Sequence, residues 1–214
     1  MDITIRPAGP EDASFIAWVM ITAGRSHLAR GFWDQYVNGT QEECLAFVRN
    51  VALTAKPHPF HHSIFIIAEK DGKPLAGLSA YDPERVSIGH YLEALPEVFE
   101  KAKWSKADQM AGLKRIESFL TCLPDNAPKA WIIESVAAKP EARRQGITNL
   151  LLTEMIERGR KAGYERAQIS VLIGNTPARR AYEKCGFRLS EGKRTTAFED
   201  TYGTPGIERL LLEF

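Results

Sequence analysis

The chain has 214 residues, enough for one sizeable hydrophobic core but few for two. A formal net charge of +1, from 28 basic and 27 acidic residues, argues against a protein built as a whole to bind nucleic acid or a membrane surface. Three scattered cysteines suit a reducing compartment, and no stretch approaches the ~20 apolar residues of a membrane span. The first residues lack the features of a signal peptide, so we expect a cytoplasmic protein with a single domain over residues 1–214.

The first third of the chain predicts a strand, two helices and a hairpin. Alternating isoleucines in residues 2–8 indicate a short strand, and an acidic, proline-led start followed by apolar spacing indicates a helix over residues 9–20. A second helix begins at Thr40, which has capping-box spacing to Glu43. Two apolar runs then flank Asp71–Gly72, a sequence typical of a tight hairpin turn.

Residues 83–128 break this alternation and indicate a helical insertion. One helix is predicted from apolar residues at helical spacing, Met110, Leu113, Ile116 and Leu120, and an earlier helical or irregular piece from Tyr91, Leu95, Phe99 and Trp104. Two interpretations stay open: the aromatic residues line a pocket or a dimer face, or the segment is a helical elaboration packed by its own apolar residues.

The last third predicts a strand–helix–strand unit. The apolar segment 130–138 indicates a central strand, 145–162 a helix and 167–173 another strand, while a short helix opens at Asn175 and residues 207–214 form a final strand. Crossovers of this length imply a right-handed βαβ unit. The chain is therefore expected to be α/β, with a mixed, mainly antiparallel central sheet flanked by helices.

The connection between the predicted strand and helix is basic. Arg143 and Arg144 stand just before the helix, and Gly146 allows a ligand to approach the backbone closely. Free amides and the dipole at a helix N-terminus favour an anion such as phosphate. A solvated surface loop is an equally good reading of this stretch alone. No Walker loop or dinucleotide-binding fingerprint is present.

Two motifs around this loop resemble those of the GNAT superfamily of N-acetyltransferases. The first reads Arg143-Arg144-Gln145-Gly146-Ile147-Thr148, and the second has Asn175, Ala178, Tyr182, Gly186 and Phe187 in register. The resemblance extends over about residues 130–188, is weaker for the N-terminal elements, and is absent from 83–128. Thr148 departs from the small residue usual at its position.

The resemblance implies acetyl-CoA as co-substrate. Its pyrophosphate would lie on the amides of residues 144–149, and its pantetheine arm would pair with the backbone of residues 136–138. The cofactor-binding residues expected from it are Val136, Ala137, Ala138, Arg143, Arg144, Gln145, Gly146, Ile147, Thr148, Asn149, Asn175 and Tyr182. Asn175 also has a simpler role as a helix cap, and the two roles are compatible.

Two residues are candidates for proton transfer. Glu134 is a carboxylate within an apolar strand, where burial would raise its pKa toward that of a useful base. The alternatives are a strand-end carboxylate paired with a nearby Arg or Lys, or one exposed in a cleft without a chemical role. Tyr182 is the candidate acid, with a packed aromatic residue as the alternative. Some family members instead carry a catalytic glutamate where this chain has Ser170, so a base at that position is not expected here.

The sequence thus predicts an acyl-CoA-dependent N-acyltransferase, most simply one that transfers acetyl to a primary amine of a small molecule or peptide by direct attack. A coenzyme-A-binding sensor without catalysis is the alternative, and a nucleic-acid module is disfavoured by the net charge. No metal is expected, because His58, His61 and His62 have no Cys or carboxylate partner nearby in sequence. Cys185 is expected to be a packing residue rather than an acyl carrier, and a homodimer is left open.

Overall fold

A seven-stranded sheet runs through the molecule in the order β1-β2-β3-β4-β5-β7-β6, in the computed structural model that describes residues 3–214. All neighbouring strands are antiparallel except the pair β4–β5. The strands are β1 (Thr4–Pro7), β2 (Phe65–Lys70), β3 (Lys73–Tyr81), β4 (Ala130–Ala138), β5 (Arg166–Leu172), β6 (Arg188–Arg194) and β7 (Gly206–Glu213). The predicted mixed, mainly antiparallel sheet is confirmed.

Eight α-helices accompany the strands in the described part of the chain. They are α1 (Ala13–Arg25), α2 (Phe32–Val37), α3 (Gln41–Ala52), α4 (Ile88–Ala102), α5 (Lys106–Cys122), α6 (Ile147–Lys161), α7 (Thr176–Lys184) and α8 (Thr196–Tyr202). Short 3₁₀ turns lie at Pro10–Asp12, His62–Ile64 and Pro140–Ala142. The predicted capping box is present: the Thr40 hydroxyl accepts from the Glu43 amide at 3.2 Å, and Glu43 accepts from the Thr40 amide at 2.7 Å. No helix in residues 3–214 has the length and apolar character needed to cross a bilayer.

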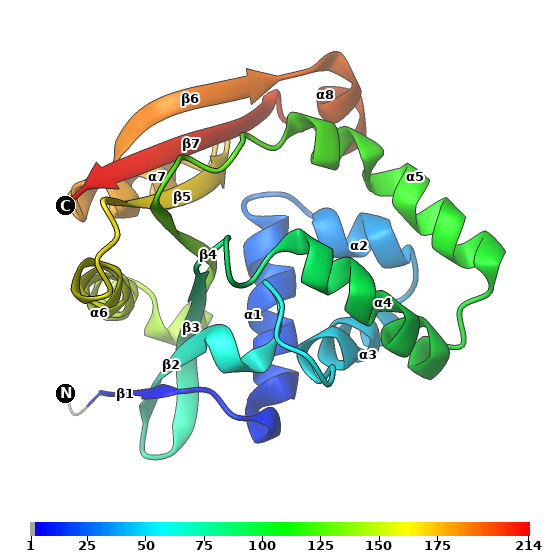
Figure 1. The fold of residues 1–214 in the computed structure, drawn as a ribbon, viewed down its shortest axis with the longest axis horizontal. Helices are drawn as coiled ribbons and strands as arrows, with labels where there is room; N and C mark the ends of the chain where they lie inside the picture. Colours follow the sequence, from blue (N-terminus) through cyan, green and yellow to red (C-terminus); the bar gives the residue numbers. More distant parts are fainter. Residues whose placement is uncertain (1–2) are drawn as a thin grey trace.

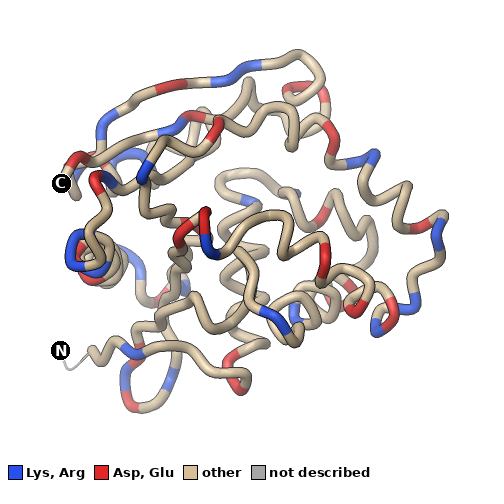
Figure 2. Tube along the Cα trace, viewed as in Figure 1, with Lys and Arg blue, Asp and Glu red and all other residues tan. Residues whose placement is uncertain are grey.

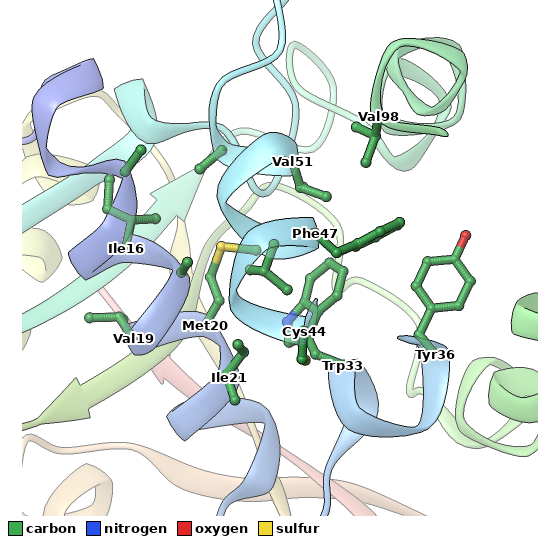
Figure 3. Packing of buried hydrophobic residues seen from close by; sticks show 14 of the residues in the cluster. Ile16, Val19, Met20, Ile21, Trp33, Tyr36, Cys44, Phe47, Val51 and Val98 are labelled. Carbon is green, nitrogen blue, oxygen red and sulfur yellow. The ribbon is translucent and has the colours of Figure 1, made fainter. Parts of the chain in front are cut away.

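Helices cover both faces of the sheet. On one face α1 packs against β3 and β4, α2 and α3 pack against α1, and α4 packs against α3; on the other face α6 lies over β2, β3 and β4 (Figure 1). Apolar side chains from α1 to α4 interdigitate in the first core, where Met20, Trp33 and Phe47 point toward one another (Figure 3). β4 therefore lies between two packed layers of helices.

The insertion forms α4 and α5, as predicted, but the packing of α5 differs from the prediction. Ile116 is buried, whereas Met110, Leu113 and Leu120 are exposed, Met110 by 72%. The contact face of α5 instead runs through Gly112, where an added Cβ would lie 2.9 Å from the ring of Tyr36. A helix that approaches through a glycine turns its larger apolar residues away from the core.

The aromatic residues of the insertion belong to the first core. Tyr91 and Phe99 are buried, and the Trp104 ring stacks on Phe99 at 5.6 Å and lies 4.6 Å from Phe47. These side chains therefore pack inside the protein, which fits the interpretation of the insertion as a helical elaboration.

Candidate functional site

A β-bulge interrupts β4 in the middle of the sheet. Ser79 of β3 pairs with Glu134 and Gly77 pairs with Ala137, so two residues of β4 face one residue of β3. Ser135, the first of these two, has a left-handed φ of 53°. A bulge of this kind bends the strand and redirects its side chains.

The bulge coincides with the point where β4 and β5 separate. Parallel pairing between them ends at Ile133 and Ile169, while β5 continues to Leu172 along β7. In Figure 1, β5, β7 and β6 diverge from β1, β2 and β3 on either side of β4. The β5-facing side of residues 134–138 therefore has no strand partner in the sheet. Its backbone groups are available to an extended ligand.

At the end of β4, a tight connection leads into α6. Arg144 and Gly146 both have a left-handed backbone, with φ of 59° and 79°. Gly146 is the N-cap, and no side chain caps the helix. An added Cβ at Gly146 would meet nothing within 4 Å. The first amides of α6 are thus open to an anion, a combination that fits a phosphate group.

The residues predicted to bind the cofactor lie along this path. Arg143, Arg144, Gln145 and Gly146 are exposed, Thr148 and Asn149 are half-buried, and Ile147 and Ala137 are buried. Two of the loop side chains are held by backbone carbonyls: Arg143 Nε donates to Ala138 at 3.3 Å and Gln145 Nε2 to Glu141 at 2.6 Å. Arg144 makes no hydrogen bond to another described residue, so its guanidinium group is free to meet a ligand.

Glu134 lies directly before the bulge and is half-buried. Burial raises the pKa of its carboxyl to about 7, and a hydrogen bond from Tyr81 acts in the opposite direction. Among residues 3–214 it forms no ion pair, which removes the alternative of a strand-end carboxylate paired with a cation. A carboxyl group that titrates near neutrality can accept a proton at physiological pH.

Asn175 and Tyr182 lie at the other side of the β4–β5 separation. Asn175 caps α7 by accepting from the Ala178 amide at 3.2 Å, and its Nδ2 donates to Ser26 Oγ at 2.6 Å. The helix-cap role is confirmed, and one amide hydrogen remains for a ligand. Tyr182 is buried with Val136 and Ile147 in the core beneath α6, and this burial raises the pKa of its phenol.

The two candidate proton carriers lie on opposite faces of the sheet. Ile133 belongs to the core that holds Tyr182, and side chains alternate along a strand, so Glu134 projects to the other face. There it lies beside Ser79 and Tyr81. Glu134 and Tyr182 thus approach the point where β4 separates from β5 from opposite faces of the sheet.

The histidine-rich segment has a structural role. His58 Nδ1 accepts from the Phe60 amide at 3.1 Å, and its Nε2 lies 2.8 Å from Thr54 Oγ1. His61 Nε2 reaches the Thr54 carbonyl at 3.1 Å. Within residues 3–214 no group of three or more His, Cys, Asp or Glu side chains is arranged to hold a metal. Cys185 is half-buried against the core beneath α6, and burial raises the pKa of its thiol.

Two residues of the site were not predicted. Tyr81 ends β3, and only the register of the bulged strand pair reveals its position beside Glu134. Ser26 ends α1 with a left-handed φ of 58° and receives the Asn175 amide from the far end of the chain. For Tyr81 the only signal in the sequence was a tyrosine at the end of a buried strand. Ser26 had no signal in the sequence.

Comparison with known proteins agrees with this geometry. The model of the family described as "Acetyltransferase (GNAT) family" matches residues 28–187. A 92-residue segment is 30% identical to GCN5-related N-acetyltransferase 6, chloroplastic, of Arabidopsis thaliana, covering 42% of this chain and 32% of that relative. The chain therefore spans about a third of this curated relative's length.

Solved structures share the fold over nearly the whole chain. An N-acetyltransferase from Staphylococcus aureus Mu50 has a TM-score of 0.63 at 19% identity, covering 98% of this chain and 100% of the other. The PaiA N-acetyltransferase from Thermoplasma acidophilum, in complex with coenzyme A, has a TM-score of 0.53 at 13% identity over both whole chains. With a family match that covers most of its length, the chain belongs to the GNAT family of acetyltransferases.

Proposed function

We propose that the protein transfers an acetyl group from acetyl-CoA to a primary amine by direct attack in a ternary complex. The observation that carries this proposal is Glu134, a carboxyl group with a pKa of about 7 at the point where β4 loses its strand partner. A pH of 7 is about 3.4 units below the pKa of a lysine-like amine, so deprotonation of that amine costs roughly 4.6 kcal/mol. A general base in the site is therefore useful.

Binding energy favours a site along the whole length of β4 and its loop. The open amides of α6, with Arg143 and Arg144, would receive the pyrophosphate. A helix terminus contributes only ~0.3–2 kcal/mol to anion binding, whereas micromolar affinity needs about −8 kcal/mol. The unpaired edge of residues 136–138 would supply part of the difference by pairing with the amide groups of the pantetheine arm.

In the proposed reaction, acetyl-CoA supplies the activated acyl group as a thioester. Glu134 accepts a proton from the attacking amine, a C–N bond forms as the C–S bond breaks, and coenzyme A leaves as a thiolate that takes a proton from solvent to become the thiol. Tyr182 would donate a hydrogen bond to the departing sulfur. The raised pKa of its buried phenol keeps the hydroxyl protonated but makes complete proton transfer less favourable than from an exposed tyrosine.

The acceptor is proposed to be a small molecule or a peptide, and the cytoplasm the place of action. Basic and acidic residues are intermixed along the whole trace (Figure 2), which supports neither a nucleic acid nor an anionic membrane as the partner. A homodimer remains compatible with this proposal.

The first experiment is isothermal titration of coenzyme A. Arg144→Glu should weaken binding by about tenfold or more, because it replaces a charge-assisted contact with a repulsive one. The matched control is Arg49→Glu, the same charge change at an exposed position of α3, which should bind as the unaltered protein does. Absence of coenzyme A binding by the unaltered protein would refute the proposal.

The second experiment measures thiol release from acetyl-CoA with a panel of amines. Turnover with at least one amine, reduced by Tyr182→Phe, is expected. Coenzyme A binding without turnover for any amine would instead favour a sensor protein, and unchanged turnover in Tyr182→Phe at every pH would remove the role of that hydroxyl.

A further inference from the structure

Tyr81 and Glu134 are diagonal neighbours on one face of the sheet. Ser79 pairs with Glu134, and Tyr81 pairs with Ile132. Because side chains two residues apart share a face, Tyr81 projects to the same side as Glu134. Diagonal positions of an antiparallel pair lie about 7–8 Å apart, a separation that a tyrosine can bridge. The register therefore places the Tyr81 hydroxyl within reach of the Glu134 carboxyl.

The surroundings hold this pair in place. Tyr81 is only 8% exposed and packs with Ala130 and Ile132, while Ser79 Oγ donates to the backbone carbonyl of Glu134 at 3.2 Å. The bulge begins at the next residue, Ser135. The main chain of Glu134 is thus held by Ser79, and its side chain shares a face of the sheet with Tyr81.

Charged groups on the elements packed against β4 are engaged elsewhere. They are Arg25 of α1 with Asp34, Arg158 and Arg160 of α6 with Glu154 and Glu157, and Arg166 of β5 with Glu213. Lys73 stands at the hairpin end of β3 and Lys161 in the exposed last turn of α6. Tyr81 is therefore the titratable neighbour that acts on the Glu134 carboxyl.

We propose that Tyr81 is a positioning residue, which donates a hydrogen bond to Glu134, orients the carboxylate and stabilises its ionised form. The proposal rests on the function proposed above, because it gives Glu134 its role as base. A phenol suits this task, since it adds no charge that would repel a protonated amine substrate and stays protonated itself: burial and the carboxylate both raise the pKa of Tyr81.

The direction of the effect follows from the two opposing influences on Glu134. Burial raises the pKa of the carboxyl, and the hydrogen bond from Tyr81 lowers it. Removal of the hydroxyl leaves burial unopposed, so the pKa of Glu134 should rise, by about one unit for a bond to a charged group. Less of the base is then ionised at neutral pH.

The test combines a titration with kinetics in Tyr81→Phe. Carboxyl ¹³C NMR should show the Glu134 signal, identified by its loss in Glu134→Gln, titrating about one pH unit higher. The acidic limb of kcat/KM should move equally, with turnover recovered at high pH and the KM for acetyl-CoA unchanged. Tyr36→Phe is the matched control, a buried tyrosine of α2 whose hydroxyl has no partner among the described residues, and should change neither measurement.

The readings separate this proposal from the proposed function. An unchanged Glu134 midpoint in folded Tyr81→Phe would overturn the role of Tyr81, whether or not the protein turns over amines. If the unaltered protein shows no turnover, the proposed function fails. The Glu134 titration midpoint in Tyr81→Phe still tests whether Tyr81 donates a hydrogen bond to the carboxylate. Should Tyr81→Phe not fold, 3-fluorotyrosine at position 81, a stronger donor of similar size, should lower the Glu134 midpoint; a midpoint that stays in place would contradict the proposal.

Discussion

Two titratable side chains with strongly shifted pKa values, His58 and Glu134, contrast in what surrounds them. Burial is the largest influence on both: it lowers the pKa of His58 to about 4 and raises that of Glu134 to about 7. Both are thereby driven toward their neutral forms. His58 lies among the N-terminal helices and has both ring nitrogens in hydrogen bonds, whereas Glu134 has Tyr81 as its neighbour and keeps part of its surface exposed.

This difference shows that a shifted pKa does not by itself identify a functional group. The loop around His58 uses the imidazole as an uncharged connector between Thr54 and the Phe60 amide. The bulge around Glu134 leaves the carboxyl beside a strand edge that no other strand occupies. Access, not desolvation, distinguishes the candidate base from the structural histidine.

The largest effect is expected on the activity of a Glu134 variant. Glu134→Gln should lower kcat/KM for the amine by about 10²–10⁴-fold, the usual contribution of a general base, because the amide cannot accept the proton. Thiol-release kinetics from pH 6 to about 9 measures it, and the acidic limb near pH 7 should vanish. Glu84→Gln, an exposed carboxylate beyond β3, is the control and should retain full activity. Equal activities of the two variants would leave Glu134 without a catalytic role.

Stability as a function of pH should separate the two residues next. Because the folded-state pKa of Glu134 lies above its ordinary value of 4.5, its contribution to stability falls as pH rises from about 4.5 to 7. The folded-state pKa of His58 lies below its ordinary 6.5, so its contribution falls as pH drops from about 6.5 to 4. Each effect is on the order of 3 kcal/mol at most, and the opposite signs largely cancel in the unaltered protein.

Single variants should expose each effect. In Glu134→Gln, the free energy of unfolding should rise more steeply between pH 4 and about 6.5 than in the unaltered protein, because the opposing contribution of Glu134 is gone. In His58→Gln the contribution of Glu134 is no longer offset by His58, so the free energy of unfolding should fall, relative to the unaltered protein, between about pH 4.5 and 7. Urea unfolding at a series of pH values provides the measurement. Parallel curves for the two variants would mean that one of the side chains is not desolvated as described.

The smallest effect concerns the glycine at the start of α6. Gly146→Ala should cost about 1–2 kcal/mol of stability, the usual penalty for a left-handed alanine, and should also weaken coenzyme A binding, because its methyl group enters the open space before the helix. Gly163→Ala is a matched control just beyond the other end of α6, with a φ of 86° and the same open surroundings. It should lose similar stability and bind coenzyme A normally; equal affinities of both variants would exclude a ligand at Gly146.

Elements with strong local signals were predicted well. Apolar runs, turn residues and caps correctly indicated β4, α6, the hairpin at Asp71–Gly72 and the Asn175 cap. The elements that were missed have weak signals: α2 and α8 are only six and seven residues long, and β6, an edge strand, has the largely exposed sequence RLSEGKR. Short helices and polar edge strands depend on packing rather than on local propensity.

The site divides in the same way. The sequence alone indicated the candidate residues, Glu134 in an apolar strand and Arg144 and Gly146 before a helix, because strand and helix-start preferences act over a few neighbouring residues. Only the tertiary structure decided that β4 bulges at Ser135, that it separates from β5 after Ile133, and that Tyr81 lies on the same face as Glu134. Strand register and separation arise from the packing of whole layers, and no local pattern encodes which side chain will lie opposite another.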